Sequence, residues 1–373
     1  MTERRFTDDG RSRRRFLATA GVLGAAGIAG CNIGTDVADD AEAPTGQIGS
    51  ARQDRELTGT SMAAMPDLAG ELTVYSGRGE FLVGDLLAFI EELYDDFSIE
   101  TRYGGSTDLV NQIVTEGEGT SADVFYSVNS GALGALAEEG RTRTLPDDVL
   151  ELVRSEFRTD EWIGTSGRAR SIPYNTEALS EGDLPDDVMA YPETFDGDLG
   201  WAPSYGSCQA FVTAMRIIEG EEATREWLNG VLEAGIRSYP DEFATCQAVA
   251  DGEIDAAFTN HYYIQRVLDG DEDAPIATTF TQGDAGAVFN VAGAAVVDAA
   301  DETLAQNFVR HLLSAEAQDY FARTTFEYPL IPDVEPIGDL PTIDEFDVPD
   351  IDLAQLSDLE ATVDLMRDVG VEI

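Results

Sequence analysis

The 373-residue sequence contains no lysine, two histidines and three cysteines, and each scarcity excludes a kind of chemistry. Without lysine there is no P-loop, because that motif uses a lysine to reach the nucleotide phosphates. The GxSxG and HExxH signatures are also missing, and neither His261 nor His311 has an evident catalytic partner. A zinc site is not expected, because the sequence has no CxxC pair and no Cys/His cluster. We therefore expect a protein that is not an enzyme.

Positive charge is scarce throughout the chain. There are 23 basic residues against 72 acidic ones, so the formal net charge is −49. The acidic residues are spread along the whole length, and the 43% of hydrophobic residues are enough for a packed core. So negative a surface repels nucleic acid, which we exclude as a partner. The composition is typical of adaptation to concentrated salt, and recruitment of cationic ligands is the alternative.

The N-terminal 31 residues have the pattern of an export signal. SRRRFL at 12–17 matches the twin-arginine pattern, and the apolar run at 16–30 is too short to span a bilayer. Small residues directly precede Cys31, as at a lipoprotein processing site where the freed cysteine is acylated. We expect a lipid-anchored protein on the extracellular face of the membrane, with 32–69 as a flexible tether. An ordinary signal peptide with an incidental cysteine is the alternative.

Beyond the tether, strands and helices alternate along the chain. Alternating or apolar runs predict strands, and amphipathic or capped runs predict helices. The expected strands lie at 71–77, 98–105, 122–128, 166–176, 199–203, 255–260 and 287–297, and the expected helices at 80–94, 106–116, 209–219, 224–234, 244–251, 302–313 and 315–323. This order predicts an α/β fold with a largely parallel sheet. Because roughly 300 residues exceed one comfortable core, we expect two lobes.

Two pairs of residues in the second half each allow two interpretations. Tyr262 and Tyr263 are adjacent in TNHYYIQR at 259–266, and such a pair on its own fills a core more often than it holds a ligand. Cys208 and Cys246 form an even pair that an oxidising compartment would allow to form a disulfide. Their spacing alone does not show whether their Cα atoms lie within bonding range.

Six motifs occur in an order and spacing that resembles the periplasmic ferric-ion-binding proteins, the solute-binding components of ABC iron importers. They are ELTVYSG, ADVFYS, GRARSIPYNTEAL, NHYY, GDAGAVFNVAGAAVV and EYPL, which together span roughly residues 70–335. The resemblance implies a two-lobed periplasmic-binding-protein fold (type II), with a ligand cleft and two crossing strands that form a hinge near 168–174 and 287–292. The lobes would then be 70–169 plus 288–335, and 170–287 plus 336–373. It also implies a monomer that delivers its ligand to ABC permease subunits in the membrane.

The resemblance also implies a metal site at the NHYY motif. Two adjacent tyrosines bind Fe³⁺ there in the family, and Tyr262 and Tyr263 occupy these positions. Fe³⁺ is a hard cation that prefers anionic oxygen, and its charge repays the deprotonation of a phenol whose free pKa is about 10. A strand-to-helix junction before the pair would let both phenols converge. Tyr174 and Tyr205 are candidates for further ligands, although the proline before Tyr174 leaves its register open by one residue.

The sequence departs from the family at two positions. Some members have a metal-binding histidine and glutamate where this chain has Gly79 and Val128. A second variant of the family relies on tyrosines and a carbonate anion held by arginines. Arg78, Arg168 and Arg170 match that arrangement, because a guanidinium group binds a carboxylate-like anion through two parallel hydrogen bonds. Carbonate is therefore the expected synergistic anion.

Several assignments at the edge of this site remain open. Phosphate is disfavoured as the anion, because Tyr205 and Glu242 stand where phosphate-binding members have a serine and an asparagine, and a carboxylate repels phosphate. Arg78 can equally be a surface charge partner, and Glu80 can supply an oxygen ligand if the first loop differs. The family alignment also sets Cys208 and Cys246 one turn inside two helices that begin at one pocket, which favours a disulfide between them.

The same fold with another ligand is the main alternative. Thiamine or a polyamine would require an aromatic box, for which Tyr75, Tyr126 and Trp201 are available beside the tyrosine pair. An oxyanion is a further candidate ligand, and an adhesive or structural role is the plainest alternative to ligand binding.

Overall fold

The structure is a computed structural model that describes residues 48, 55, 57–349, 351–357 and 359–373. The expected export signal, Cys31 and most of the expected tether lie outside these residues. Among the residues described, no helix is both long and apolar enough to cross a bilayer.

The folded body begins earlier than the sequence indicates. Met62 and Leu68 are buried, and Met62–Ala64 form a 3₁₀ turn. Ser61 Oγ and Met62 N both donate hydrogen bonds to the buried carboxylate of Glu316, at 2.6 and 2.9 Å. The expectation of a flexible tether up to residue 69 is therefore wrong for its last residues, which are held against the body.

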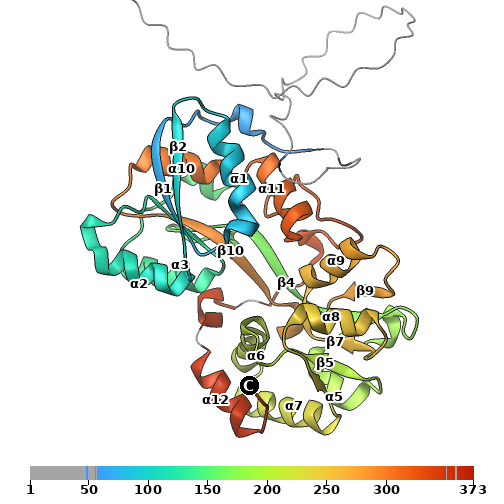
Figure 1. Ribbon diagram of the computed structural model, residues 1–373. Coiled ribbons are helices and arrows are strands. Elements are labelled where there is room, and N and C mark those ends of the chain that lie inside the picture. The colour runs from blue at the N-terminus through green and yellow to red at the C-terminus, as the bar shows by residue number, and fades with distance from the viewer. Residues whose placement is uncertain (1–47, 49–54, 56, 350, 358) are drawn as a thin grey trace, which may run out of the picture.

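Two lobes lie one above the other in Figure 1, and β4 and β10 run between them. The upper lobe contains β1 (Gly70–Ser76), α1 (Glu80–Glu92), β2 (Phe97–Tyr103), α2 (Ser106–Glu116), β3 (Val124–Ser127), α3 (Ser130–Glu138), α4 (Asp147–Leu150), α10 (Glu302–His311) and α11 (Ala315–Tyr320). The lower lobe contains α5 (Tyr191–Thr194), β5 (Leu199–Trp201), α6 (Gly206–Ile218), α7 (Glu221–Glu233), β6 (Arg237–Ser238), α8 (Glu242–Ala250), β7 (Ala256–Ala257), β8 (Thr259–Asn260), α9 (His261–Gly270), β9 (Ile276–Thr279) and α12 (Glu360–Asp368). The connecting strands are β4 (Ile163–Asn175) and β10 (Phe289–Val296).

The sheet is mixed rather than largely parallel. Its strand order is β2-β1-β3-β10-β4-β7-β5-β6, and β8 and β9 pair with β4 off this path. Within each lobe the pairing is parallel as predicted, β1 with β2 and β3, and β5 with β6 and β7. The prediction fails at the centre, because β10 and β4 run antiparallel to each other and to their other neighbours.

The connecting strands bring two arginines to the junction of the lobes. Asn290 of β10 is paired with Arg168 of β4, and Arg170 N donates to Val288 O at 2.8 Å. From Arg170 onward β4 leaves β10 and pairs with β8 and β9. Because side chains alternate along a strand, Arg168 and Arg170 project from the same face of β4.

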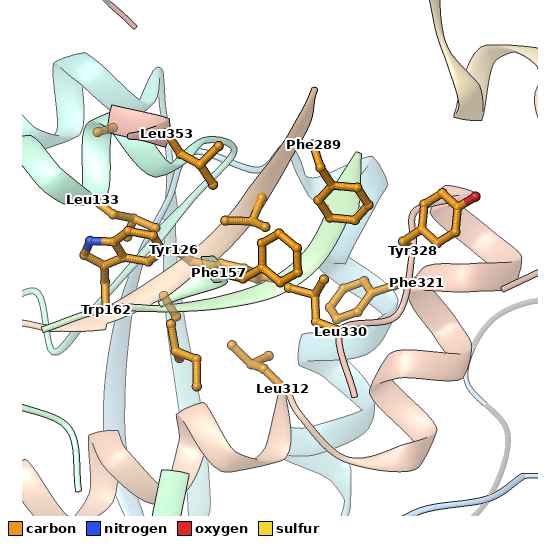
Figure 2. Close-up of a cluster of buried hydrophobic side chains, with 14 of the residues drawn as sticks. Tyr126, Leu133, Phe157, Trp162, Phe289, Leu312, Phe321, Tyr328, Leu330 and Leu353 are labelled. Carbon is orange, nitrogen blue, oxygen red and sulfur yellow. The ribbon is translucent and has the colours of Figure 1, made fainter. Parts of the chain in front are cut away.

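An apolar cluster behind these strands fixes their position (Figure 2). Phe289 of β10 lies 4.9 Å from Phe157 and 5.6 Å from Tyr328, measured between ring centroids. Gly167 of β4 lies against the Phe289 ring, and an added Cβ would come within 2.1 Å of it. Glycine is therefore required at position 167, one residue before the first of the two arginines.

Candidate functional site

A cleft of about 640 Å³ lies between the two lobes. Val128 and Asn129 line it from the upper lobe, Ser207 and Asn260 line it from the lower lobe, and Arg168 and Arg170 of β4 also line it. Its size falls in the range of ordinary small-ligand sites, roughly 300–1,000 Å³. The cleft is therefore the natural place to look for a binding site.

Three tyrosines lie close in sequence to residues that line this cleft, although none of the three is itself among the lining residues. Tyr262 and Tyr263 lie in the first turn of α9, directly after β8, and their ring centroids are 4.3 Å apart. Tyr205 precedes α6, and its hydroxyl is hydrogen-bonded to the Tyr263 hydroxyl at 2.7 Å. Asn260 Nδ2 donates to the Tyr262 hydroxyl at 3.3 Å. The junction between β8 and α9 thus brings the adjacent phenols together, and Tyr205 joins them from another helix.

The surroundings keep these phenols protonated when no cation is bound. Burial raises the pKa of Tyr262, and this outweighs the opposing effect of Arg168. Burial and the neighbouring Tyr262 also raise the pKa of Tyr263. Arg266, one turn further along α9, places its guanidinium carbon 5.3 Å from the centroid of each ring. Arg266 was not predicted from the sequence, although its spacing of three and four residues from the tyrosine pair indicates that it lies on the same face of the helix.

Arg170 is bound to a carboxylate inside the lower lobe. Its Nη1 donates to Glu242 Oε1, and its Nη2 donates to the carbonyl oxygen of Phe258. Glu242 is fully buried, and its carboxylate also accepts from Ser207 Oγ at 2.6 Å and from Asn260 N at 2.9 Å. Arg170 therefore lies at the predicted site, but its side chain is already occupied by an anionic group of the protein.

Arg78 is neither at the surface nor free to bind an anion. Its side chain is buried, and it donates to Glu327 Oε2 and, at 2.9 Å, to Ser166 Oγ. Glu327 Oε2 also accepts from Ser166 Oγ at 2.8 Å and from Thr325 Oγ1 at 3.0 Å. The interpretation of Arg78 as a surface charge partner is wrong, because its side chain is buried against Glu327 of the EYPL motif, which only folding brings close.

Arg168 differs from the other two arginines. The Nε atoms of all three lack a hydrogen-bond partner among the described residues, but Arg168 also has no hydrogen bond to a carboxylate. Its Nε lies 3.9 Å from Glu327 Oε1, which is beyond hydrogen-bond distance. Arg168 also lines the cleft. It retains hydrogen-bonding capacity toward the cleft.

Tyr174 lies away from the tyrosine cluster. It is half-buried near the end of β4, where it pairs with Ala256 and Ala277. Burial and the negative charge of Glu181 raise its pKa. It lies four positions after Arg170, a distance of about 13 Å along β4. The structure therefore does not bring Tyr174 to Tyr262 and Tyr263.

The aromatic box considered for thiamine or a polyamine is not assembled at the cleft. Tyr75, Tyr126 and Trp201 are buried in the core. Tyr75 is bound to Glu116, and Trp201 Nε1 donates to Ser238 Oγ at 3.2 Å. These side chains belong to the packing of the two lobes.

His261 is not among the residues that line the cleft, and both of its ring nitrogens are bound to main-chain groups. Its Nδ1 accepts from Ala169 N at 3.1 Å, and its Nε2 donates to Phe326 O at 2.9 Å. Burial lowers its pKa to about 4, so the ring is neutral at neutral pH. Its contacts fix the start of α9 against β4.

The expected disulfide is not formed in this structure. Cys208 and Cys246 are both buried free thiols, and each faces a different neighbour. Cys246 Sγ is hydrogen-bonded to Thr259 Oγ1 at 3.3 Å, whereas Cys208 lies beside Arg170. Burial raises the pKa of Cys208 to about 12 and also raises that of Cys246, so neither thiol ionises readily.

These thiols give a simple prediction for a variant in which Cys31 is replaced by serine. Folded protein should react very slowly with a thiol reagent at neutral pH, because the thiolate is the reactive form. Two thiols per chain should titrate after unfolding without reductant, since Cys208 and Cys246 are both free. Failure to detect any thiol in the unfolded, unreduced chain would show that a disulfide forms in the exported protein.

Comparison with known proteins agrees with the two-lobed fold. The model of the bacterial extracellular solute-binding protein family matches residues 86–345. The chain belongs to this family. This solute-binding protein is 30% identical over 325 residues to the major ferric iron-binding protein of Neisseria meningitidis serogroup A, which covers 85% of this chain and 97% of that protein.

Further relatives of this solute-binding protein carry similar descriptions. The Fe(3+)-binding periplasmic protein of Serratia marcescens is 28% identical over 311 residues, with 80% of this chain and 90% of that protein covered. Among solved structures, iron-bound HitA from Pseudomonas aeruginosa has a TM-score of 0.69 and 30% identity over 80% of this chain and 99% of that one. The resemblance to ferric-ion-binding proteins is confirmed, and with it the two-lobed fold.

Proposed function

We propose that this solute-binding protein binds ferric iron as the cargo of an ABC importer and delivers it to the permease. The phenol oxygens of Tyr262, Tyr263 and Tyr205 would coordinate the ion. The observation that carries the proposal is the convergence of these phenols, with a hydrogen bond of 2.7 Å between the hydroxyls of Tyr205 and Tyr263. Phenolate is a hard anionic oxygen donor, and ferric iron is a hard cation. The iron-binding relatives support the same cargo.

The proposal is tested by loading purified protein with ferric citrate. Tyrosinate bound to Fe³⁺ gives a visible charge-transfer band, and we expect this band together with one iron atom per chain. Bound iron should also raise the thermal midpoint, because a ligand that binds only the native state stabilises it. A colourless protein whose thermal midpoint does not change would rule out iron as the cargo.

Iron binding should weaken as the pH falls. The raised pKa values of Tyr262 and Tyr263 mean that each phenol must lose a proton to bind the ion. The apparent affinity should therefore fall by about one order of magnitude per pH unit for each phenolate ligand. A titration of the band against a fixed competing chelator, corrected for the chelator's own protonation, measures this slope. A slope of zero would exclude phenolate ligands.

Not all of the three candidate arginines are available to bind the carbonate expected from the sequence. Arg78 and Arg170 are each bound to a buried carboxylate, on Glu327 and Glu242. Of the three candidates, Arg168 alone has no hydrogen bond to a carboxylate among the described residues, and it lines the cleft. A carbonate ion in this site would therefore bind to Arg168.

We also propose that the protein is exported by the twin-arginine route and acts at the extracellular face as a lipid-anchored monomer. The sequence around Cys31 supports the anchor, and the net charge of −49 supports a surface adapted to concentrated salt. Replacement of Cys31 by serine should release the protein from the membrane into the medium. Membrane fractionation of cells expressing each form measures the difference, and continued attachment of the variant would exclude this anchor.

A further inference from the structure

Glu242 is a fully buried carboxylate at the candidate site that the ligand set proposed above does not use. It is the first residue of α8, but it does not cap that helix, because the side chain of Asp241 accepts from Ala244 N. An ionised side chain is costly to bury unless it is paired and hydrogen-bonded. The contacts of Glu242 show what holds it there.

Three donors from three different elements converge on this carboxylate. Arg170 of β4 and Ser207 of α6 donate to Oε1, and Asn260 of β8 donates its backbone N–H to Oε2. A guanidinium group, a hydroxyl and a main-chain N–H are the donors that proteins use to bind a small oxyanion. A protein carboxylate therefore fills a donor set that is suited to such an anion.

Arg170 cannot easily turn to another anion. Its Nη2 donates to the carbonyl oxygen of Phe258, and its guanidinium carbon lies 4.7 Å from the centroid of the Phe211 ring. Asn260 connects this arrangement to the metal site, because its backbone N binds Glu242 while its side chain binds the Tyr262 hydroxyl. Asn260 thus bonds both to the Glu242 carboxylate and to the phenol of Tyr262.

The charges at the site favour a built-in anion. Glu242 cancels the charge of Arg170, and three phenolates from Tyr205, Tyr262 and Tyr263 would cancel the charge of Fe³⁺. A carbonate dianion would add two negative charges to this arrangement. The remaining cations beside it are Arg168, which already lies 3.9 Å from Glu327 Oε1, and Arg266, whose guanidinium group lies against the tyrosine rings. A buried site with excess charge is unfavourable.

We propose that Glu242 replaces the soluble synergistic anion, so that this protein binds ferric iron without carbonate or phosphate. The proposal rests on the proposed function. Glu242 then determines whether iron binding requires a soluble anion. The proposal requires no contact between the Glu242 carboxylate and the ion.

The test uses protein in a buffer free of bicarbonate and phosphate, under CO₂-free air. Iron is supplied as ferrous chloride, which air oxidises in the presence of the protein, so that no chelator can serve as the anion. Wild type should develop the charge-transfer band, and added bicarbonate or phosphate should leave the apparent affinity unchanged. Glu242→Gln should lose about tenfold or more in affinity without an anion, and recover when bicarbonate or phosphate is added.

Glu233→Gln is the matched control, because it removes one exposed carboxylate from the neighbouring helix α7. It should bind iron as wild type does in both buffers. The proposal is overturned if the wild-type band requires bicarbonate, or if Glu242→Gln binds as tightly as wild type without an anion. Absence of the band in wild type under both conditions would reject iron binding itself. The wild-type result decides the proposal even if Glu242→Gln does not fold.

Discussion

Replacing Tyr262 or Tyr263 by phenylalanine should reduce the charge-transfer band and weaken ferric-ion binding by more than the roughly 10–100-fold lost with an outer-shell partner. Each change removes one anionic oxygen and keeps the ring, whose centroid lies 4.3 Å from that of the other tyrosine. The fold should survive, because the loss of a single hydrogen bond costs about 1 kcal/mol. Metal analysis and competition with a chelator measure the loss of iron.

Tyr205 and Tyr174 provide the comparison for this experiment. Tyr205→Phe should also weaken binding, because the Tyr205 hydroxyl is bonded to that of Tyr263. Tyr174→Phe is the matched control and should bind iron as wild type does, since its neighbours are strands β7 and β9. Iron retained at full occupancy in both Tyr262→Phe and Tyr263→Phe would refute the assignment. Loss of iron in Tyr174→Phe would restore the prediction made from the sequence.

Glu327→Gln should lower the free energy of unfolding by about 3–5 kcal/mol, the usual cost of removing one partner from a buried ion pair. The variant leaves the guanidinium group of Arg78, which is only 1% exposed, without its anionic partner. Two aromatic rings, of Tyr126 and Phe321, lie 5.5 and 5.4 Å from the guanidinium carbon, but they cannot replace a full charge. Urea-induced unfolding at constant salt concentration measures the change.

An exposed ion pair supplies the control. Glu156→Gln removes one of the two carboxylates that pair with Arg154, the other being Asp344, and the Glu156 and Arg154 side chains are 53% and 35% exposed. Surface pairs of this kind contribute at most about 1 kcal/mol, so the two variants should differ clearly. A cost for Glu327→Gln no larger than that for Glu156→Gln would show that Arg78 finds another partner or becomes solvated.

The contribution of Glu327 should also depend on pH in a defined direction. Burial raises its pKa, but Arg78 and Arg168 outweigh burial, so the folded-state pKa lies below the ordinary value. The stabilisation is therefore present above about pH 4.3, the pKa of a free glutamate, and is lost as the pH falls through the folded-state value. The difference in stability between wild type and Glu327→Gln should shrink in acid.

Local sequence patterns predicted most of the fold. The helix expected at 106–116 is α2, and the strand expected at 71–77 is β1. Within each lobe these alternating elements also gave the parallel pairing correctly. Helix α3 was not predicted, because its sequence SGALGALAE is rich in small residues and lacks a polar face. The antiparallel centre was not predicted from the pattern of elements, since it arises where the chain passes between lobes.

The candidate site could be predicted only in part for a different reason. The adjacent tyrosines are visible in the sequence, whereas the partners of the arginines are remote from them. Glu327 lies 249 residues from Arg78, and Glu242 lies 72 residues from Arg170. In a chain with 72 acidic residues, no local pattern indicates which carboxylate will be buried against which guanidinium group.

The position of His261 connects the tyrosine pair to the acid stability of the whole fold. Its folded-state pKa of about 4 lies below the ordinary 6.5 because burial disfavours the charged ring. The unfolded chain therefore takes up this proton first, and between those two values each pH unit lost costs about 1.4 kcal/mol of stability. Mild acid thus has two effects on this protein. Protons compete with iron for the phenol oxygens, and the buried neutral His261, which fixes the start of α9, lowers the free energy of unfolding. Iron release in acid and loss of structure should be harder to separate here than in a relative with a polar residue at this position.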